Sequence, residues 1–209
     1  MATARRLAIE CTTEACSVAL FEANALVAGE RQMLGRGHAE ALVPMIARLP
    51  GRGAAASIVV GRGPGSFTGV RIGLAAARAL AFAWRAELAG YSTLALVAAM
   101  ARAARGAQPV LVAMTGGHGE WFVQPFAADG TPTAALASLR PEDAASMPGA
   151  LVAGSQAEAL VTRRGAGEAL AIWPDARALA RLPDAALSQE LAPLYGRAPD
   201  ARLPAGTRL

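Results

Sequence analysis

Three short stretches near the start of the chain alternate apolar and polar positions. Residues 7–11, 16–21 and 26–31 show this pattern, and polar turns of a few residues separate them. A period of two is typical of strands that bury one face, and tight turns join such strands into an antiparallel meander. We therefore expect three antiparallel strands at the start of the fold.

Helical spacing replaces this alternation after residue 38. Apolar residues between 39 and 49 recur at steps of three and four, which predicts an amphipathic helix. The short apolar run at 57–60 is typical of a strand that is buried on both faces of a parallel sheet. These segments predict a sheet that mixes antiparallel and parallel strands.

Helices and strands continue to alternate after a glycine-rich loop. We expect a helix that ends at Trp84, a strand at 87–92 and a second helix at 94–105. This order predicts an α/β layered domain at residues 1–106, with helices on the faces of its sheet.

A second unit is expected after residue 106. Two apolar segments, at 109–116 and 120–127, predict strands, and Trp121 with Phe122 should begin the second as a core-facing strand. The rest is rich in Pro and Ala and only weakly periodic. Residues 107–209 therefore predict a smaller C-terminal subdomain with an irregular tail.

All 20 basic residues of the 209-residue chain are arginines, and the formal net charge is +4. The arginines are dispersed, which favours a solvated surface over a patch that binds nucleic acid. Because there is no lysine, the chain can form neither a lysine Schiff base nor a P-loop lysine contact. The absence of lysine therefore excludes enzymes that form a Schiff base through their own lysine and NTPases that use a P-loop lysine.

The start of the chain does not resemble a signal peptide, because Arg5 and Arg6 interrupt its apolar residues. No apolar run reaches the ~18–20 residues of a membrane-spanning helix. We therefore expect a soluble, cytoplasmic protein without a membrane partner. Cys11 and Cys16 lack metal-ligand spacing and are expected to be small buried apolar residues.

The glycine-rich loop VGRGPGSFTGVRIG, at residues 60–73, lies where many proteins bind phosphate. A Walker A loop needs a lysine, which is absent, and Pro64 removes one backbone amide. The glycine spacing also fails the G-x-G-x-x-G dinucleotide fingerprint and the G-x-S-x-G nucleophile elbow. We interpret the segment as a structural loop, with the residues Gly63, Pro64, Gly65, Ser66, Thr68 and Gly69.

Specific conformations are expected in this loop. Gly63 and Gly65 can take positive φ, and Ser66 or Thr68 should cap the following helix. Small residues at 69, 73 and 76 or 77 would let another backbone approach closely, either within the domain or from a partner. Arg71 lies near the positive end of the helix dipole, so we expect an anionic partner for it, a carboxylate before a phosphate.

Catalytic and metal-binding residues are not predicted. His38 and His118 are 80 positions apart, so no zinc motif of the HExxH kind exists, and His38 is expected to hydrogen-bond near a helix start. Ser66 is expected to be a cap rather than a nucleophile. Glu10 and Glu14 are expected at solvent-facing turn positions.

The segment GRGPGSFTGVRIGLAAARALA resembles the central motif of the TsaB (YeaZ-type) family, which is related to the M22 glycoprotease-like superfamily. Further segments resemble the family's opening hairpin, its helices and its closing part. They are LAIECTTEACSVAL, GRGHAEALVPMIARL, YSTLALVA, AMTGGHGEWFVQPF and LAPLYGRAPDARLP. The resemblance is dense at residues 7–102 and sparse beyond.

This resemblance implies the actin/Hsp70-like ATPase (ASKHA) architecture, with two RNase H-like subdomains of which the second is shortened. It also implies a noncatalytic scaffold or activating subunit of the system that installs threonylcarbamoyl on adenosine 37 of tRNA. The expected partners are a TsaD-like catalytic paralogue, in a heterodimer, and a TsaE-like ATPase, while tRNA would be reached indirectly. When alone, the chain could form a homodimer.

The resemblance places the partner surface on the first helix and on one face of the second. The residues concerned are His38, Leu42, Val43, Ile46, Arg71, Gly73, Ala76 and Leu80. No cofactor is expected on this chain alone, and ATP and a metal are expected on the partner subunits.

Two departures from the family pattern concern the ends of the expected central strands. The family usually has Asp at the position of Glu10, and an Asp-Ala-Arg run at Thr115-Gly116-Gly117. Both lower the expectation of ATP hydrolysis. The alternative function that stays open is a stand-alone M22-type peptidase or ATPase.

Overall fold

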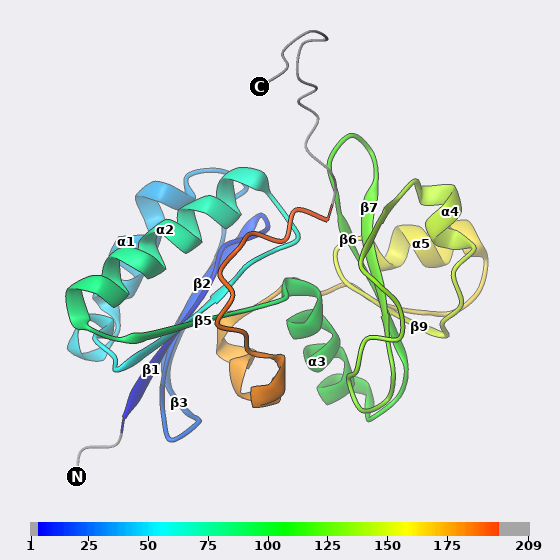
Figure 1. Ribbon diagram of the computed structural model, residues 1–209. Coiled ribbons are helices and arrows are strands. Elements are labelled where there is room, and N and C mark those ends of the chain that lie inside the picture. The colour runs from blue at the N-terminus through cyan, green and yellow to red at the C-terminus, as the bar shows by residue number, and fades with distance from the viewer. Residues whose placement is uncertain (1–3, 197–209) are drawn as a thin grey trace, which may run out of the picture.

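The computed structural model describes residues 4–196 and contains two five-stranded sheets (Figure 1). The first sheet has the order β3-β2-β1-β4-β5. The strands are β1 (Arg5–Glu10), β2 (Ala15–Glu22), β3 (Ala25–Met33), β4 (Ser57–Gly61) and β5 (Glu87–Tyr91). The first three pair antiparallel, and β1, β4 and β5 pair parallel, so the predicted mixed sheet is confirmed.

The second sheet repeats this topology with the order β10-β9-β6-β7-β8. Its strands are β6 (Val110–Thr115), β7 (Trp121–Phe126), β8 (Ala137–Leu139), β9 (Leu151–Ala153) and β10 (Glu168–Leu170). Strands β6, β7 and β8 pair antiparallel, while β6, β9 and β10 pair parallel. The repeat confirms the predicted α/β architecture of two RNase H-like subdomains, and three-residue strands make the second sheet the smaller one.

Helices cover both faces of each sheet. The helices are α1 (His38–Arg48), α2 (Phe67–Trp84), α3 (Thr93–Arg105), α4 (Pro141–Ala145) and α5 (Ala157–Arg164), with 3-10 turns η1 (Pro50–Gly53), η2 (Ala176–Arg181) and η3 (Asp184–Ala186). Helices α1 and α2 cover the outer face of the first sheet, and α4 and α5 the outer face of the second (Figure 1).

Helix α3 lies between the two sheets and packs on both. Leu96 joins a buried cluster with Phe21 and Val59 of the first sheet. Leu94 and Val97 join another with strands β6, β7 and β9. One helix therefore supplies core residues to both subdomains, since its two sides are both buried.

The C-terminal segment returns to the first sheet instead of extending the second. Ala176 and Leu179 of η2 are buried beside β1 and β2. Farther on, Ser188 pairs with Gly90 of β5, and Leu194 N donates to Arg62 O over 2.8 Å. The boundary at residue 106 stays a prediction, but this segment packs with the first subdomain although it follows the second in sequence.

Two further expectations concern the irregular C-terminal tail and the absence of a membrane-spanning helix. Residues 197–209 of the expected tail, with the end of its family-like segment, lie outside the described residues. Within residues 4–196, none of the helices has the length and apolar character needed to cross a membrane.

Candidate functional site

The glycine-rich loop links β4 to α2 and is held against the β1–β2 turn. Gly63 has a φ of 97°, which favours glycine, and the Gly63–Pro64 bond is cis. Ser66, rather than Thr68, caps α2, because its Oγ accepts from Gly69 N over 3.2 Å. Gly65 does not take positive φ; its lack of a Cβ matters because a Cβ there would lie 2.0 Å from Thr12 O.

The row of small residues on α2 faces the interior. A Cβ on Gly69 would lie 2.2 Å from Cys11 O, and one on Gly73 would lie 2.8 Å from Cys11 Sγ. The Cys11 thiol also donates to Gly69 O over 3.2 Å. The close approach that the small residues allow is therefore between α2 and the end of β1, within one subdomain.

Glu10, the last residue of β1, is fully buried, so the expectation of a solvent-facing turn position is wrong. Its Oε1 accepts from Thr12 N over 2.8 Å, and Thr93 Oγ1 donates to Oε2 over 3.4 Å. Burial raises the pKa of this carboxyl group, and the hydrogen bonds from Thr12 act in the opposite direction. The side chain packs over Gly61, where a Cβ would lie 2.4 Å from the carboxylate.

Arg71 has aromatic partners, so the expected carboxylate partner is wrong among the described residues. Its Cζ lies 3.6 Å from the centre of the Phe67 ring, and its Nε donates to Tyr195 Oη over 3.2 Å. The Phe67 and Tyr195 rings are 5.2 Å apart. Sequence reasoning missed Tyr195, which comes 124 residues after Arg71.

The predicted partner surface divides between the interior and the outside of the molecule. Its buried members are His38, Leu42, Ile46 and Gly73, and its half-buried members are Ala76 and Leu80. His38 Nε2 donates to Thr13 O over 2.7 Å, which is the kind of hydrogen bond expected near a helix start. Only Val43, at 55% exposed, and Arg71 face outward, so the buried four are corrected to core positions.

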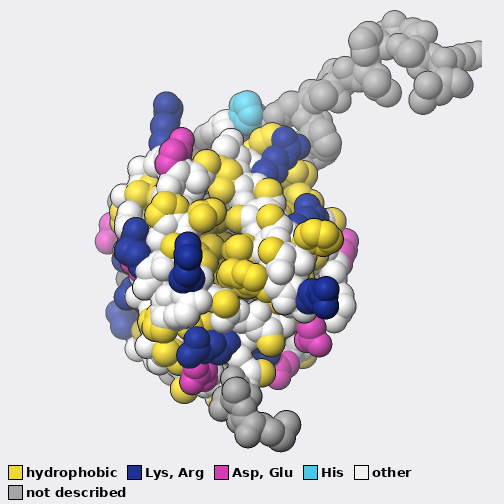
Figure 2. Space-filling view, turned by 90° about the vertical axis from the view of Figure 1, so that its left-hand side faces the viewer, with side chains coloured by type: hydrophobic (Ala, Val, Ile, Leu, Met, Phe, Trp, Pro, Cys, Tyr) yellow, Lys and Arg dark blue, Asp and Glu magenta, His cyan; other side chains and the backbone are white. Residues whose placement is uncertain are grey.

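A different set of residues forms the outer face of α1 and α2. We call it the outer face and define it by Ala39, Val43, Ala47, Ala75, Ala79 and Phe82, all of which are exposed. Phe82 is 90% exposed. Figure 2 shows hydrophobic side chains gathered across the middle of this side of the molecule, with arginines around them. The sequence indicates this outer face, because residues 75, 79 and 82 share one side of α2 and the buried residues Leu74 and Ala77 lie on the other side.

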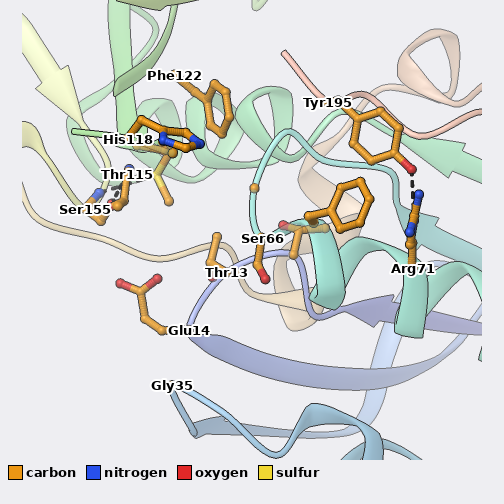
Figure 3. Close-up of a pocket in the computed structure, with 16 residues that line it drawn as sticks. Thr13, Glu14, Gly35, Ser66, Arg71, Thr115, His118, Phe122, Ser155 and Tyr195 are labelled. Atoms are coloured by element: carbon orange, nitrogen blue, oxygen red, sulfur yellow. Dashed lines mark hydrogen bonds between the residues drawn. The ribbon is translucent and has the colours of Figure 1, made fainter. Parts of the chain in front are cut away.

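A cavity of about 590 Å³ lies between the two subdomains. Its walls come from the β1–β2 turn, the start of α2 and the β6–β7 turn, together with Ser155 and Tyr195. The segments that follow β1 and β4 and the end of β6 line this cavity, and open α/β sheets bind ligands outside the carboxyl ends of their strands. In Figure 3, Phe122 and His118 of the second subdomain face Thr13 and Ser66 of the first.

The second subdomain contributes a pair of hydroxyl groups to the cavity, and the first contributes the carboxylate of Glu14. Thr115 N donates to Ser155 Oγ over 3.0 Å, and the two hydroxyl oxygens are 3.1 Å apart. Glu14 accepts from Trp173 Nε1 over 2.5 Å. Within residues 4–196, no group of three or more His, Cys, Asp or Glu side chains is arranged to hold a metal ion. Glu10 does not line the cavity.

A family model and a solved structure each match more than half of this chain. The family model TsaD, described as tRNA N6-adenosine threonylcarbamoyltransferase, matches residues 32–157, more than half of the chain. The chain is 30% identical to the solved structure of YeaZ from Pseudomonas aeruginosa, with a TM-score of 0.73, over 86% of this chain and 90% of that one.

Two curated relatives carry the same name. The chain is 37% identical to the tRNA threonylcarbamoyladenosine biosynthesis protein TsaB of Escherichia coli (strain K12) over 123 residues, 56% of this chain and 53% of the relative. It is 41% identical to the protein of that name from Haemophilus influenzae over 85 residues, 36% of this chain and 34% of the relative. The alignments thus span about half or less of these relatives. The family model, the repeated sheet topology and the YeaZ structure agree with the sequence motif, and the chain belongs to the TsaB (YeaZ-type) family.

Proposed function

We propose that this chain is a noncatalytic scaffold subunit in the formation of threonylcarbamoyladenosine in tRNA, and that it pairs with a TsaD-like catalytic paralogue. The names of the curated relatives and the matching family model support the process. The observation that carries the scaffold role is the outer face of α1 and α2.

The outer face has the composition of a helix-packing surface. Phe82 is 90% exposed, although burying a side chain of this kind is worth about 1.5–3 kcal/mol. The alanines around it, such as Ala75 and Ala79, have little side-chain bulk and would let a partner helix approach closely. Large aromatic residues among small neighbours are typical anchors of protein interfaces. We therefore assign the partner surface to this face.

The chemistry of the process would belong to the partners in this proposal. ATP and a metal would be held by the TsaD-like and TsaE-like subunits, and tRNA would be reached through the complex, in the cytoplasm. A homodimer through the same outer face is the expected state of the chain when the paralogue is absent.

A titration of this chain with its TsaD-like paralogue tests the proposal. We expect a stable complex, and we expect Phe82→Glu to weaken it by about thirtyfold or more, because an interface anchor contributes about 2 kcal/mol or more. Leu26→Glu is the matched control, because Leu26 is a 48% exposed apolar residue on β3, away from α1 and α2. The control should bind like the parent chain.

Two results would contradict this assignment. One is a complex that Leu26→Glu weakens as much as Phe82→Glu does. The other is ATP turnover or proteolysis by the purified chain alone, which would favour the stand-alone peptidase or ATPase. Measuring the molecular mass with and without the paralogue separates the homodimer from the heterodimer.

A further inference from the structure

The residues that line the cavity between the subdomains have no part in the proposed scaffold role. Its volume of about 590 Å³ lies within the range of small-molecule sites in proteins. It is lined by the segments that follow β1 and β4 and by the end of β6, the side of the strands on which α/β sheets bind ligands. The residues that line it therefore indicate which ligand would fit.

One side of the cavity combines an exposed aromatic ring with a fixed cation. Phe67 lines the cavity and is 54% exposed, a large fraction for a phenylalanine. The Arg71 guanidinium stacks on its ring at 3.6 Å and is fixed by the hydrogen bond from Nε to Tyr195 Oη. Since that bond uses Nε, both Nη groups of Arg71 remain without a hydrogen-bond partner in the described part of the chain. A fixed guanidinium whose two Nη groups are unused suits a carboxylate.

The opposite wall of the cavity is also lined by apolar side chains. Phe122 and Met114 of the second subdomain line the same cavity and are nearly fully buried, so their positions are set by packing. Figure 3 shows Phe122 facing the cavity from the side opposite Ser66 and Thr13. Because Phe122 and Met114 expose so little of their surface, the aromatic ring that is accessible to a flat ligand is that of Phe67.

The charges limit how anionic the ligand can be. Glu14 and Arg71 both line the cavity and have opposite charges, so their sum is zero. In Figure 3 they lie on opposite sides of the cavity. One guanidinium can neutralise one negative charge, whereas a polyphosphate would bring several charges to a cavity that already contains a carboxylate.

From these observations we propose that the cavity binds a planar aromatic monoanion, with its ring against Phe67 and its single carboxylate on Arg71. This inference does not depend on the scaffold role, because the outer face and the cavity use different residues. Phe67 and Arg71 would then be binding residues, and Tyr195 a positioning residue that fixes the guanidinium.

Binding of a matched pair of probes to the full chain tests this inference. Indole-3-acetate carries the carboxylate, indole-3-acetamide is its neutral counterpart, and ATP with Mg²⁺ is the polyanionic comparison. Isothermal titration or ligand-observed NMR over the millimolar range should show that the acid binds about tenfold or more tightly than the amide, as expected for hydrogen bonds to a charged group.

Substitutions then show which side chains produce the preference for the acid over the amide. Arg71→Gln should remove the preference for the acid, leaving acid and amide equally weak, whereas Phe67→Leu should weaken both without changing their ratio. Arg85→Gln, at the other end of α2, is the control and should bind like the parent chain. Unchanged thermal unfolding would show that each variant is folded.

Three outcomes would overturn the proposal. They are no binding of the acid, equal binding of acid and amide by the parent chain, and tighter binding of ATP with Mg²⁺ than of indole-3-acetate. An equal loss of acid binding in Arg85→Gln and Arg71→Gln would also overturn it, because the contact would then not be specific to the cavity.

Discussion

The two sheets have the same strand order and the same pairing, yet the ends of their central strands are built differently. In the first subdomain, β1 ends at Glu10, which is fully buried and accepts a hydrogen bond from Thr93 at the start of α3. In the second, β6 ends at Thr115, which is exposed and hydrogen-bonds to Ser155. One topology therefore supports a sealed strand end in one half of the molecule and an open one in the other.

The helices explain this difference. Helix α2, which follows the fourth strand of the first sheet, has 18 residues, whereas α5, in the same place in the second, has 8. The longer helix has room both to seal β1 with its glycines and to carry an outer face. The short one leaves the end of β6 open to the cavity. Three predictions test this contrast, beginning with the largest expected effect.

Gly69→Ala should destabilise the protein by about 3 kcal/mol. Alanine is about 1 kcal/mol better than glycine within a helix, but its Cβ would lie 2.2 Å from the Cys11 carbonyl oxygen, and backbone atoms cannot yield easily. Gly117→Ala, in the β6–β7 turn, is the control, because no atom lies within 4 Å of a Cβ there. Urea unfolding should show a change within ±0.5 kcal/mol for the control; equal losses for both would contradict a seal specific to the first subdomain.

Glu10→Gln should stabilise the protein at neutral pH and have less effect in acid. Burial raises the pKa of Glu10 in the folded state, so folding favours its protonated form, and the parent chain loses stability as pH rises from the unfolded pKa through the folded one. Glutamine can accept from Thr12 N and donate to Thr93 without carrying charge. The stability advantage of the variant should therefore be absent below about pH 4 and should grow above it.

Unfolding by urea at several pH values measures this effect. An advantage that does not change with pH would show that the carboxyl group is ionised equally in the folded and unfolded chains. Glu14→Gln provides the comparison at a half-buried position on the cavity wall.

Thr115→Ala should have the smallest effect, less than about 1 kcal/mol, with no pH dependence. The substitution removes only the exposed side-chain hydrogen bonds of Thr115 Oγ1 with Ser155 and Gln156, which water can replace. The same urea series measures it. A loss comparable to that of Gly69→Ala would mean that the second strand end is as tightly built as the first.

The sequence predicted those parts of the fold that depend on local pattern. Alternation located β1 to β3, and helical spacing located α1 to α3. The strands β8 to β10 were not predicted, since three residues in an Ala- and Pro-rich segment give no usable periodicity.

The candidate site was harder to predict because its neighbours are distant in sequence. Burial of Glu10 depends on Thr93, 83 residues later, and the partner of Arg71 is Tyr195, 124 residues later. Phe82 could have been recognised from its helical phase alone. The predicted partner surface instead included His38, Leu42, Ile46 and Gly73, which pack inside the subdomain.

The return of the C-terminal segment affects the order in which the protein can be completed during synthesis. Ala176 and Leu179 cover part of the inner face of the first sheet, next to Phe21, although they emerge from the ribosome more than a hundred residues after it. The first subdomain is therefore translated first, but its packing is completed only after the second subdomain has been translated. Until residues 176–179 dock, a nascent chain exposes apolar strand surface beside Phe21, even when the second sheet is already complete.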